Sequence, residues 1–202
     1  MRWCFTASAH PDLEPRLDAY VSLVERWADR LDLTSPGDLA GFGERHVADA
    51  LRLLPLLQSL PQGPALDVGS GAGVPGIPLA IASPDRPWRL LERRRGRAAF
   101  LEEAVRSLEL SAEVVVADAR AASRRPGLAR AHVFAVARAV APPAEALSLL
   151  LPFVAEGGIA AVFVGASGRL PEKASLWAEG IAIVRREADH EGREYLESPG
   201  NL

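Results

Sequence analysis

Cysteine and long apolar runs are nearly absent from this chain of 202 residues. Cys4 is the only cysteine, which excludes an internal disulfide and a metal cluster built from cysteines. Apolar runs such as residues 159–164 are far shorter than the roughly 20 residues of a membrane span. Residues 1–5 also lack the apolar stretch and cleavage site of a secretory signal. We therefore expect a cytoplasmic protein with one hydrophobic core and no membrane segment.

Lysine and histidine are scarce as well. Lys173 is the only lysine among 23 basic residues, and the 4 histidines show no ligand-like spacing, so we expect no metal site. The net charge is −3, but residues 89–138 hold 11 arginines against 6 acids. Such a local excess is typical of a phosphate-binding face, and also of solvated helices in an arginine-rich protein. The count alone leaves both interpretations open.

The apolar pattern divides the chain into two parts. Helical periodicity covers residues 13–33 and 40–58, which predicts a helical N-terminal extension over residues 1–60. Residues 61–202 instead alternate short apolar strands with helices, which favours one compact unit with a doubly wound, mostly parallel α/β sheet of Rossmann-like type. The predicted strands are 65–68, 89–92, 114–118, 132–137 and 158–164; the predicted helices are 76–82, 97–110 and 144–153. Residues 181–186 and 193–196 read as a closing antiparallel pair.

A glycine-rich loop follows the first predicted strand, where such folds bind their ligands. Its third glycine comes one residue earlier than in the dinucleotide fingerprint, and an acid, Asp67, precedes it. An acid there repels a pyrophosphate but suits the ammonium group of a cofactor that carries an amino acid. The predicted cofactor-binding residues of this segment are Asp67, Gly69, Ser70, Gly71, Gly73 and Val74.

Two further acids end the next two strands. Glu92 lies 19 residues beyond Gly73, where a carboxylate accepts hydrogen bonds from ribose hydroxyls, and Asp118 lies where it would face the amine of an adenine. Acids at three strand ends fit S-adenosylmethionine, which is a cation with a ribose, an adenine and no phosphate. A nicotinamide cofactor and a merely structural glycine turn remain the alternatives.

The residues that surround this loop resemble those of a known family. The chain is similar to the glucose-inhibited division protein B family, bacterial methyltransferases that act on N7 of a guanine in 16S RNA of the small ribosomal subunit. The most specific match is the Val-Pro-Gly-Ile-Pro-Leu run at 74–79, directly after the glycine loop. Further matches extend over nearly the whole chain, at Tyr20, Trp27, 33–35, 45–51, 90–92, Arg97, 100–101 and 137–141. The resemblance implies a class I methyltransferase domain at 61–202 that binds S-adenosylmethionine.

The resemblance also implies roles for single residues. Glycines 69, 71 and 73 with Val74 would line the cofactor site, and Glu92 would hold the ribose. The backbone at Arg120 and Ala121 would approach the adenine, and Arg138 would lie beside the cofactor and position the reactants. Guanine N7 carries a free lone pair, so the transfer needs alignment rather than a general base.

RNA contact is expected from basic residues near the predicted site. The candidates are Arg45, His46, Arg93, Arg94, Arg95 and Arg97. The chain departs from the family pattern at Asp32 in place of an asparagine, at Val164-Gly165 in place of a lysine-glycine pair, and in an acidic segment at 193–197. The lost lysine and the acidic segment weaken the expected binding of RNA. They leave the cofactor site unchanged.

We therefore expect a monomeric enzyme that acts on ribosomal RNA or on the small subunit itself. Because a net charge of −3 gives little hold on bare RNA, an RNA presented with ribosomal protein is the favoured substrate. The alternatives are a divergent methyltransferase for another RNA or a small molecule, a binding module that retains the cofactor pocket without catalysis, and a nicotinamide oxidoreductase.

Overall fold

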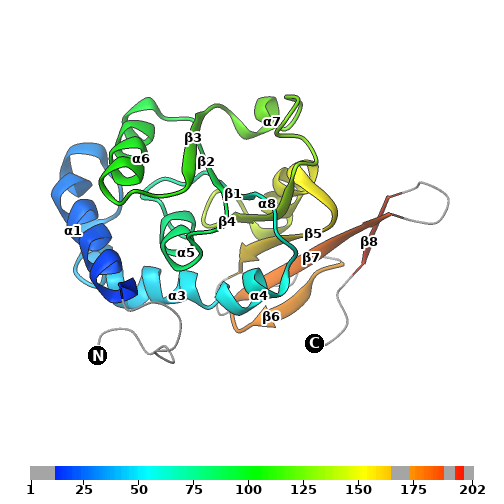
Figure 1. Ribbon diagram of the computed structural model, residues 1–202, viewed down its shortest axis with the longest axis horizontal. Coiled ribbons are helices and arrows are strands. Elements are labelled where there is room, and N and C mark those ends of the chain that lie inside the picture. The colour runs from blue at the N-terminus through cyan, green and yellow to red at the C-terminus, as the bar shows by residue number, and fades with distance from the viewer. Residues whose placement is uncertain (1–11, 165–172, 189–193, 198–202) are drawn as a thin grey trace.

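A computed structural model describes residues 12–164, 173–188 and 194–197. Its centre is an eight-stranded sheet with the order β3-β2-β1-β4-β5-β7-β6, and β8 pairs with β7 (Figure 1). Strands β1 to β5 run parallel, whereas β7 is antiparallel to β5, β6 and β8. The strands are β1 (Ala65–Val68), β2 (Trp88–Glu92), β3 (Ala112–Val116), β4 (His132–Ala137), β5 (Val154–Phe163), β6 (Ser175–Ala178), β7 (Ile181–Ala188) and β8 (Glu194–Glu197). The predicted doubly wound, mostly parallel sheet is confirmed.

Helices cover both faces of this sheet because its strands are apolar on both sides. On β2, Leu90 joins a core cluster with α1 (Leu13–Leu31), α5 (Gly76–Ala82) and α6 (Arg95–Ser107). Its neighbour Leu91 points to the opposite face and joins the cluster beneath α7 (Ala119–Ala122), α8 (Pro143–Leu150) and the 3₁₀ turn Leu151–Phe153. The sheet therefore lies between two helical layers, as α/β sheets with crossover helices do.

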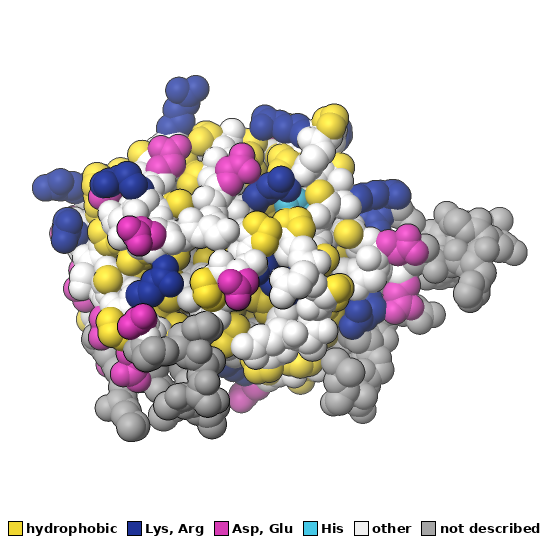
Figure 2. Space-filling model, in the orientation of Figure 1, with side chains coloured by type: hydrophobic (Ala, Val, Ile, Leu, Met, Phe, Trp, Pro, Cys, Tyr) yellow, Lys and Arg dark blue, Asp and Glu magenta, His cyan; other side chains and the backbone are white. Residues whose placement is uncertain are grey.

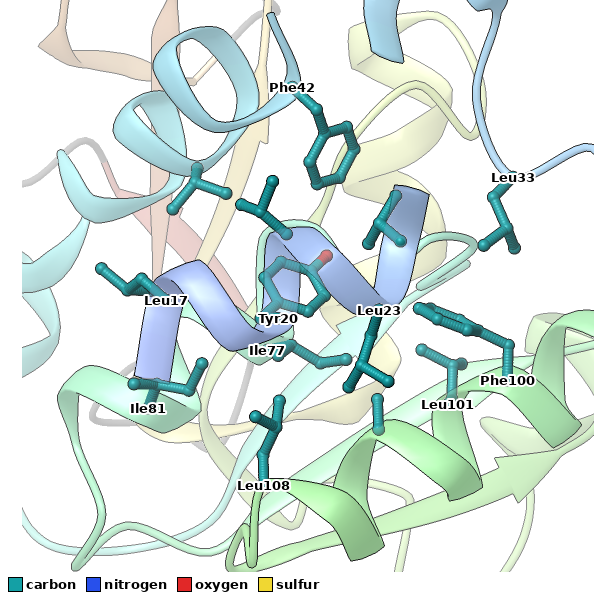
Figure 3. Close-up of a cluster of buried hydrophobic side chains, with 14 of the residues drawn as sticks. Leu17, Tyr20, Leu23, Leu33, Phe42, Ile77, Ile81, Phe100, Leu101 and Leu108 are labelled. Atoms are coloured by element: carbon teal, nitrogen blue, oxygen red, sulfur yellow. The ribbon is translucent and has the colours of Figure 1, made fainter. Parts of the chain in front are cut away.

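The first helix of the N-terminal extension is part of the core. Leu17, Tyr20 and Leu23 of α1 are buried in one cluster with residues of α5 and α6, and Figure 3 shows Tyr20 near Ile77 and Leu23 near Phe100. The helix ends at Asp32, whose φ of 49° is left-handed. Asparagine and aspartate both tolerate this conformation, so Asp32 preserves the cap where the family has asparagine.

The prediction of one helix over 40–58 is wrong. The chain forms the turn α2 (Pro36–Leu39), a π-helical turn η1 (Gly43–Val47), α3 (Ala48–Leu51) and α4 (Leu54–Ser59). In the π-turn the N–H of Ala48 donates to the carbonyl of Gly43, five residues back. Pro55 has no N–H to continue a helix from α3, so the chain restarts at Leu54 with the proline in its first turn.

The C-terminal strands confirm one prediction and add an element. The pair predicted at 181–186 and 193–196 corresponds to β7 and β8, with Arg186 opposite Leu196. Strand β6 was not predicted, and it covers the outer side of β7. Val164, which replaces the family lysine, packs into the core next to α8, and its N–H donates to the carbonyl of Gly180. Residues 165 and 193, the other parts of the departures noted above, lie outside the described residues.

Candidate active site

A cavity of about 650 Å³ opens at the carboxyl ends of the parallel strands. One wall consists of the loops that follow β1, β2, β3 and β4, at residues 69–72, 92–94, 117–120 and 138–141. The opposite wall comes from the N-terminal extension, through Leu33, Thr34, Asp38 and His46. The volume is within the range of small-molecule sites, and the position is the one at which open α/β sheets bind ligands.

The glycine loop after β1 needs its glycines for two reasons. Gly69, Gly71 and Gly73 all have positive φ, at 73°, 55° and 92°. A Cβ on Gly69 would lie 2.2 Å from Cγ1 of Val140, and one on Gly73 would lie 2.4 Å from Cδ1 of Ile77. Glycine is the residue that permits both the left-handed backbone and this close packing. The loop therefore brings backbone, rather than side chains, to the cavity wall.

Glu92 is held in place by two backbone N–H groups. Gly71 donates to its Oε2 at 3.0 Å and Arg94 donates to its Oε1 at 2.8 Å. The side chain is only 5% exposed, yet it lines the cavity. Each carboxylate oxygen accepts one of these bonds and retains a lone pair, so the group is fixed and still able to accept hydroxyl donors.

Asp67 lies beneath the loop rather than in the cavity wall. Gly76 N–H donates to its Oδ2 at 3.0 Å, and no partner for Oδ1 is found among the described residues. Burial raises the pKa of Asp67 to about 7. The carboxyl group thus links β1 to the first turn of α5, while its predicted contact with a cofactor ammonium stays a prediction.

The loop after β3 presents backbone and a carboxylate to the cavity. Oδ1 of Asp118 accepts from the N–H groups of Arg120 and Ala121, at 2.9 and 3.2 Å, which caps α7. Asp118 and Arg120 line the cavity, whereas Ala121 does not. The Arg120 guanidinium also pairs with Glu145 of α8 at 3.1 Å, a residue that the sequence analysis did not single out.

Arg138 joins the end of β4 to the N-terminal extension. Its guanidinium donates to Nδ1 of His46 at 2.8 Å and to Oδ2 of Asp49 at 3.2 Å. It also lies over the ring of Phe163, 4.9 Å from the centroid. Arg138 borders the cavity. The guanidinium hydrogen bonds described here all go to the N-terminal extension, so in this geometry Arg138 positions His46.

Two side chains to which the sequence assigned no role complete the site. Tyr20 donates from its hydroxyl to the carbonyl of Ala72 at 2.6 Å, so α1 anchors the glycine loop. Asp38 lines the cavity and accepts from Ser35 Oγ at 2.6 Å. The serine caps α2, and its hydrogen bond lowers the pKa of Asp38. The Ser-Pro-Gly-Asp run at 35–38 has the spacing of a helix N-terminal cap, which was the available signal.

The basic residues predicted for RNA contact differ in their exposure and in their partners. Arg93, Arg94 and Arg95 are exposed at the cavity rim or next to it. Arg97 also lines the cavity, is partly buried, and donates to the backbone carbonyl of Asp32. Arg45 is half exposed and pairs with Asp38 at 3.5 Å. Figure 2 shows one face of the molecule, on which basic and acidic side chains alternate without forming a continuous basic patch.

The described residues also bear on two expected absences. They contain no group of three or more His, Cys, Asp or Glu side chains arranged to hold a metal ion. Within the same part of the chain, no helix has the length and apolarity needed to cross a membrane.

The strand order and the cavity place the protein in the class I methyltransferase fold. An O-methyltransferase, TomG from Streptomyces achromogenes, solved with S-adenosylmethionine, superimposes with a TM-score of 0.52 at 21% identity, covering 78% of this chain and 68% of that one. A branched-chain polyamine synthase from Thermus thermophilus reaches a TM-score of 0.54 at 17% identity, covering 78% of this chain and 48% of that one. These similarities define the fold and leave the reaction open.

Sequence relatives narrow the class to one family. The family described as rRNA small subunit methyltransferase G matches residues 13–172. A ribosomal RNA small subunit methyltransferase G from Granulibacter bethesdensis is 40% identical over 164 residues, covering 80% of this chain and 74% of the relative. One from Gluconobacter oxydans is 34% identical over 180 residues, covering 88% and 89%. The chain belongs to the rRNA small subunit methyltransferase G family, which confirms the resemblance seen in the sequence.

Proposed function

We propose that the protein transfers a methyl group from S-adenosylmethionine to N7 of a guanine in 16S RNA of the small ribosomal subunit, in the cytoplasm. The proposal is carried by the position of Glu92 at the end of β2. Two backbone N–H groups donate to its carboxylate, and it lines the same cavity as the glycine loop. The names of the relatives supply the substrate class.

The residues of the cavity suit S-adenosylmethionine. Glu92 would accept from the hydroxyls of a ribose with its remaining lone pairs, and Asp118, which caps α7, would lie beside the adenine. Their charges favour a cationic ligand over a pyrophosphate. When bound, S-adenosylmethionine supplies a methyl group on a sulfonium centre. Glu92, the loop backbone and Tyr20 behind the loop then fix the position of that ligand.

Methyl transfer to guanine N7 requires that the attacking nitrogen, the methyl carbon and the sulfur be aligned. Because guanine N7 has a free lone pair, no side chain needs to remove a proton before transfer, and holding the reactants in line supplies most of the acceleration. Arg138 serves this end indirectly, because it ties the extension, with His46, to the end of β4.

The exposed arginines 93, 94 and 95 would contact RNA phosphates at the cavity rim. With a net charge of −3 the protein as a whole does not attract RNA, so we favour the assembled or partly assembled subunit as substrate and a monomer as the acting form.

The test is transfer from methyl-labelled S-adenosylmethionine to small subunits from a strain that lacks the family enzyme. We expect label in 7-methylguanosine at a single position of the RNA. Tight cofactor binding by calorimetry without label in any RNA would refute the proposed reaction and favour a binding module. Protection by NAD but not by S-adenosylmethionine in a thermal melt would refute the cofactor.

A further inference from the structure

The wall of the cavity that the extension supplies contains one imidazole in an unusual setting. His46 lies in the π-turn η1, so an extra residue in that turn sets the direction of its side chain. Its ring packs edge-on against Phe42, with centroids 5.3 Å apart. The ring is only partly exposed and lines the same cavity as the glycine loop and Glu92. The imidazole is thus held by packing and turned toward the ligand space.

The contact with Arg138 determines which nitrogen of His46 carries the proton. A guanidinium has only donors, so Nδ1, which lies 2.8 Å from the Arg138 nitrogen, must accept and is unprotonated. Burial, and next the charge of Arg138, lower the pKa of His46, against the smaller opposing effects of Asp38 and Asp49. The ring is therefore neutral at pH 7, with its proton on Nε2.

The free nitrogen Nε2 can therefore only donate. Among the described residues it lies 3.6 Å from Oδ1 of Asp38, beyond ordinary hydrogen-bond distance. Asp38 already accepts from Ser35 and pairs with Arg45. The N–H on Nε2 thus has only a long contact with Asp38, which also contributes to the lowered pKa of that carboxyl, and a ligand acceptor that comes within ordinary hydrogen-bond distance would take over the N–H.

A guanine shows two acceptors on the edge to be methylated, N7 and O6, whereas adenine shows N7 and an amine donor. N7 must stay unbonded to attack the methyl group, so on this edge a hydrogen-bond donor recognises guanine through O6. We infer that His46 is the residue that reads the acceptor base, by donating from Nε2 to O6 of the guanine, with Arg138 as the positioning residue that fixes its tautomer. The inference rests on the proposed function and adds the source of its base specificity.

The test removes the two ends of this hydrogen bond separately. Small subunits are reconstituted with RNA that carries guanine, 2-aminopurine or inosine at the mapped acceptor position. 2-Aminopurine lacks O6, whereas inosine retains O6 and lacks only the 2-amino group. Methylation rates are measured with the wild-type protein, with His46→Phe, which retains a ring against Phe42 without a donor, and with His46→Gln, which retains both an acceptor and a donor.

We expect the ratio of the guanine rate to the 2-aminopurine rate to be at least 10-fold larger for the wild type than for His46→Phe. Intrinsic differences in N7 reactivity cancel in this double-mutant cycle. Inosine should react within about threefold of guanine, and His46→Gln should recover part of the discrimination.

Equal ratios in the wild type and His46→Phe would overturn the inference even if both proteins methylate guanine, because a structural role would lower all rates alike. Failure of the wild type to methylate any guanine would instead refute the proposed function, and the inference with it.

Discussion

Replacement of Glu92 by glutamine should weaken cofactor binding strongly. The carboxylate accepts one N–H from Gly71 and one from Arg94, and both are charge-assisted bonds at a side chain that is 5% exposed. Glutamine retains one acceptor oxygen, so its amide nitrogen must face the other N–H. A hydrogen bond to a buried charged group contributes about 1.5–3 kcal/mol, which predicts a free energy of unfolding lower by about that amount.

The effect on binding follows from the same atoms. Two ribose hydroxyls would donate to Glu92, and glutamine offers fewer acceptor lone pairs and no charge. A loss of about 1.5–3 kcal/mol corresponds to a dissociation constant roughly 10 to 150 times larger.

Calorimetric titration with S-adenosylmethionine and urea unfolding measure the two effects. Glu102→Gln is the matched control, because Glu102 is an exposed acid on α6. A dissociation constant for Glu92→Gln within threefold of the wild type would refute our assignment of the ribose position.

Three further predictions concern other parts of the molecule. Arg86 donates to four backbone carbonyls, those of Leu57, Leu60, Pro61 and Gly63, so Arg86→Leu should lower the free energy of unfolding by about 2–4 kcal/mol; an unchanged urea midpoint would contradict this. Because the folded pKa of Asp67 is raised to about 7, stability should fall as pH rises from about 4 to 7 and then level off. Asp67→Asn should flatten that profile in urea titrations, and a decline equal to the wild type's would exclude Asp67 as its source. Replacing Arg93, Arg94 and Arg95 by glutamine should weaken subunit binding and reduce its salt dependence while leaving cofactor affinity unchanged, unlike the same change at the exposed pair Arg124 and Arg125.

The sequence predicts those helices and strands whose apolar residues follow a single regular spacing. Strand β1 and helix α5 have the expected bounds, because an apolar strand, a glycine loop and a short apolar helix follow one another there. The split of residues 40–58 was not predictable from spacing, because a π-turn shifts the helical phase by one residue. Strand β6 was missed because its four residues lie at the sheet edge without an alternating pattern.

The site shows the same division. Gly69, Gly71 and Glu92 are brought together as expected, because backbone chemistry and strand ends determine their positions. The contact of Arg97 with Asp32 and the contacts of Arg138 depend on the N-terminal extension. Local sequence does not specify how this extension packs against the sheet. Asp67 has the residue type expected for a ligand contact, yet its nearest donor is the N–H of Gly76.

The π-turn makes this active site sensitive to chain length. It holds one residue more than an α-helical turn, and each residue of a helix rotates the following side chain by about 100°. Removal of a single codon at 43–47 would let the segment relax to a regular helix, which stabilises the backbone locally. The same deletion would turn His46 away from Arg138 and break the hydrogen bond between them, while α1 stays packed in the core. In-frame deletions at 43–47 should therefore give proteins that fold normally but have lost the discrimination between bases.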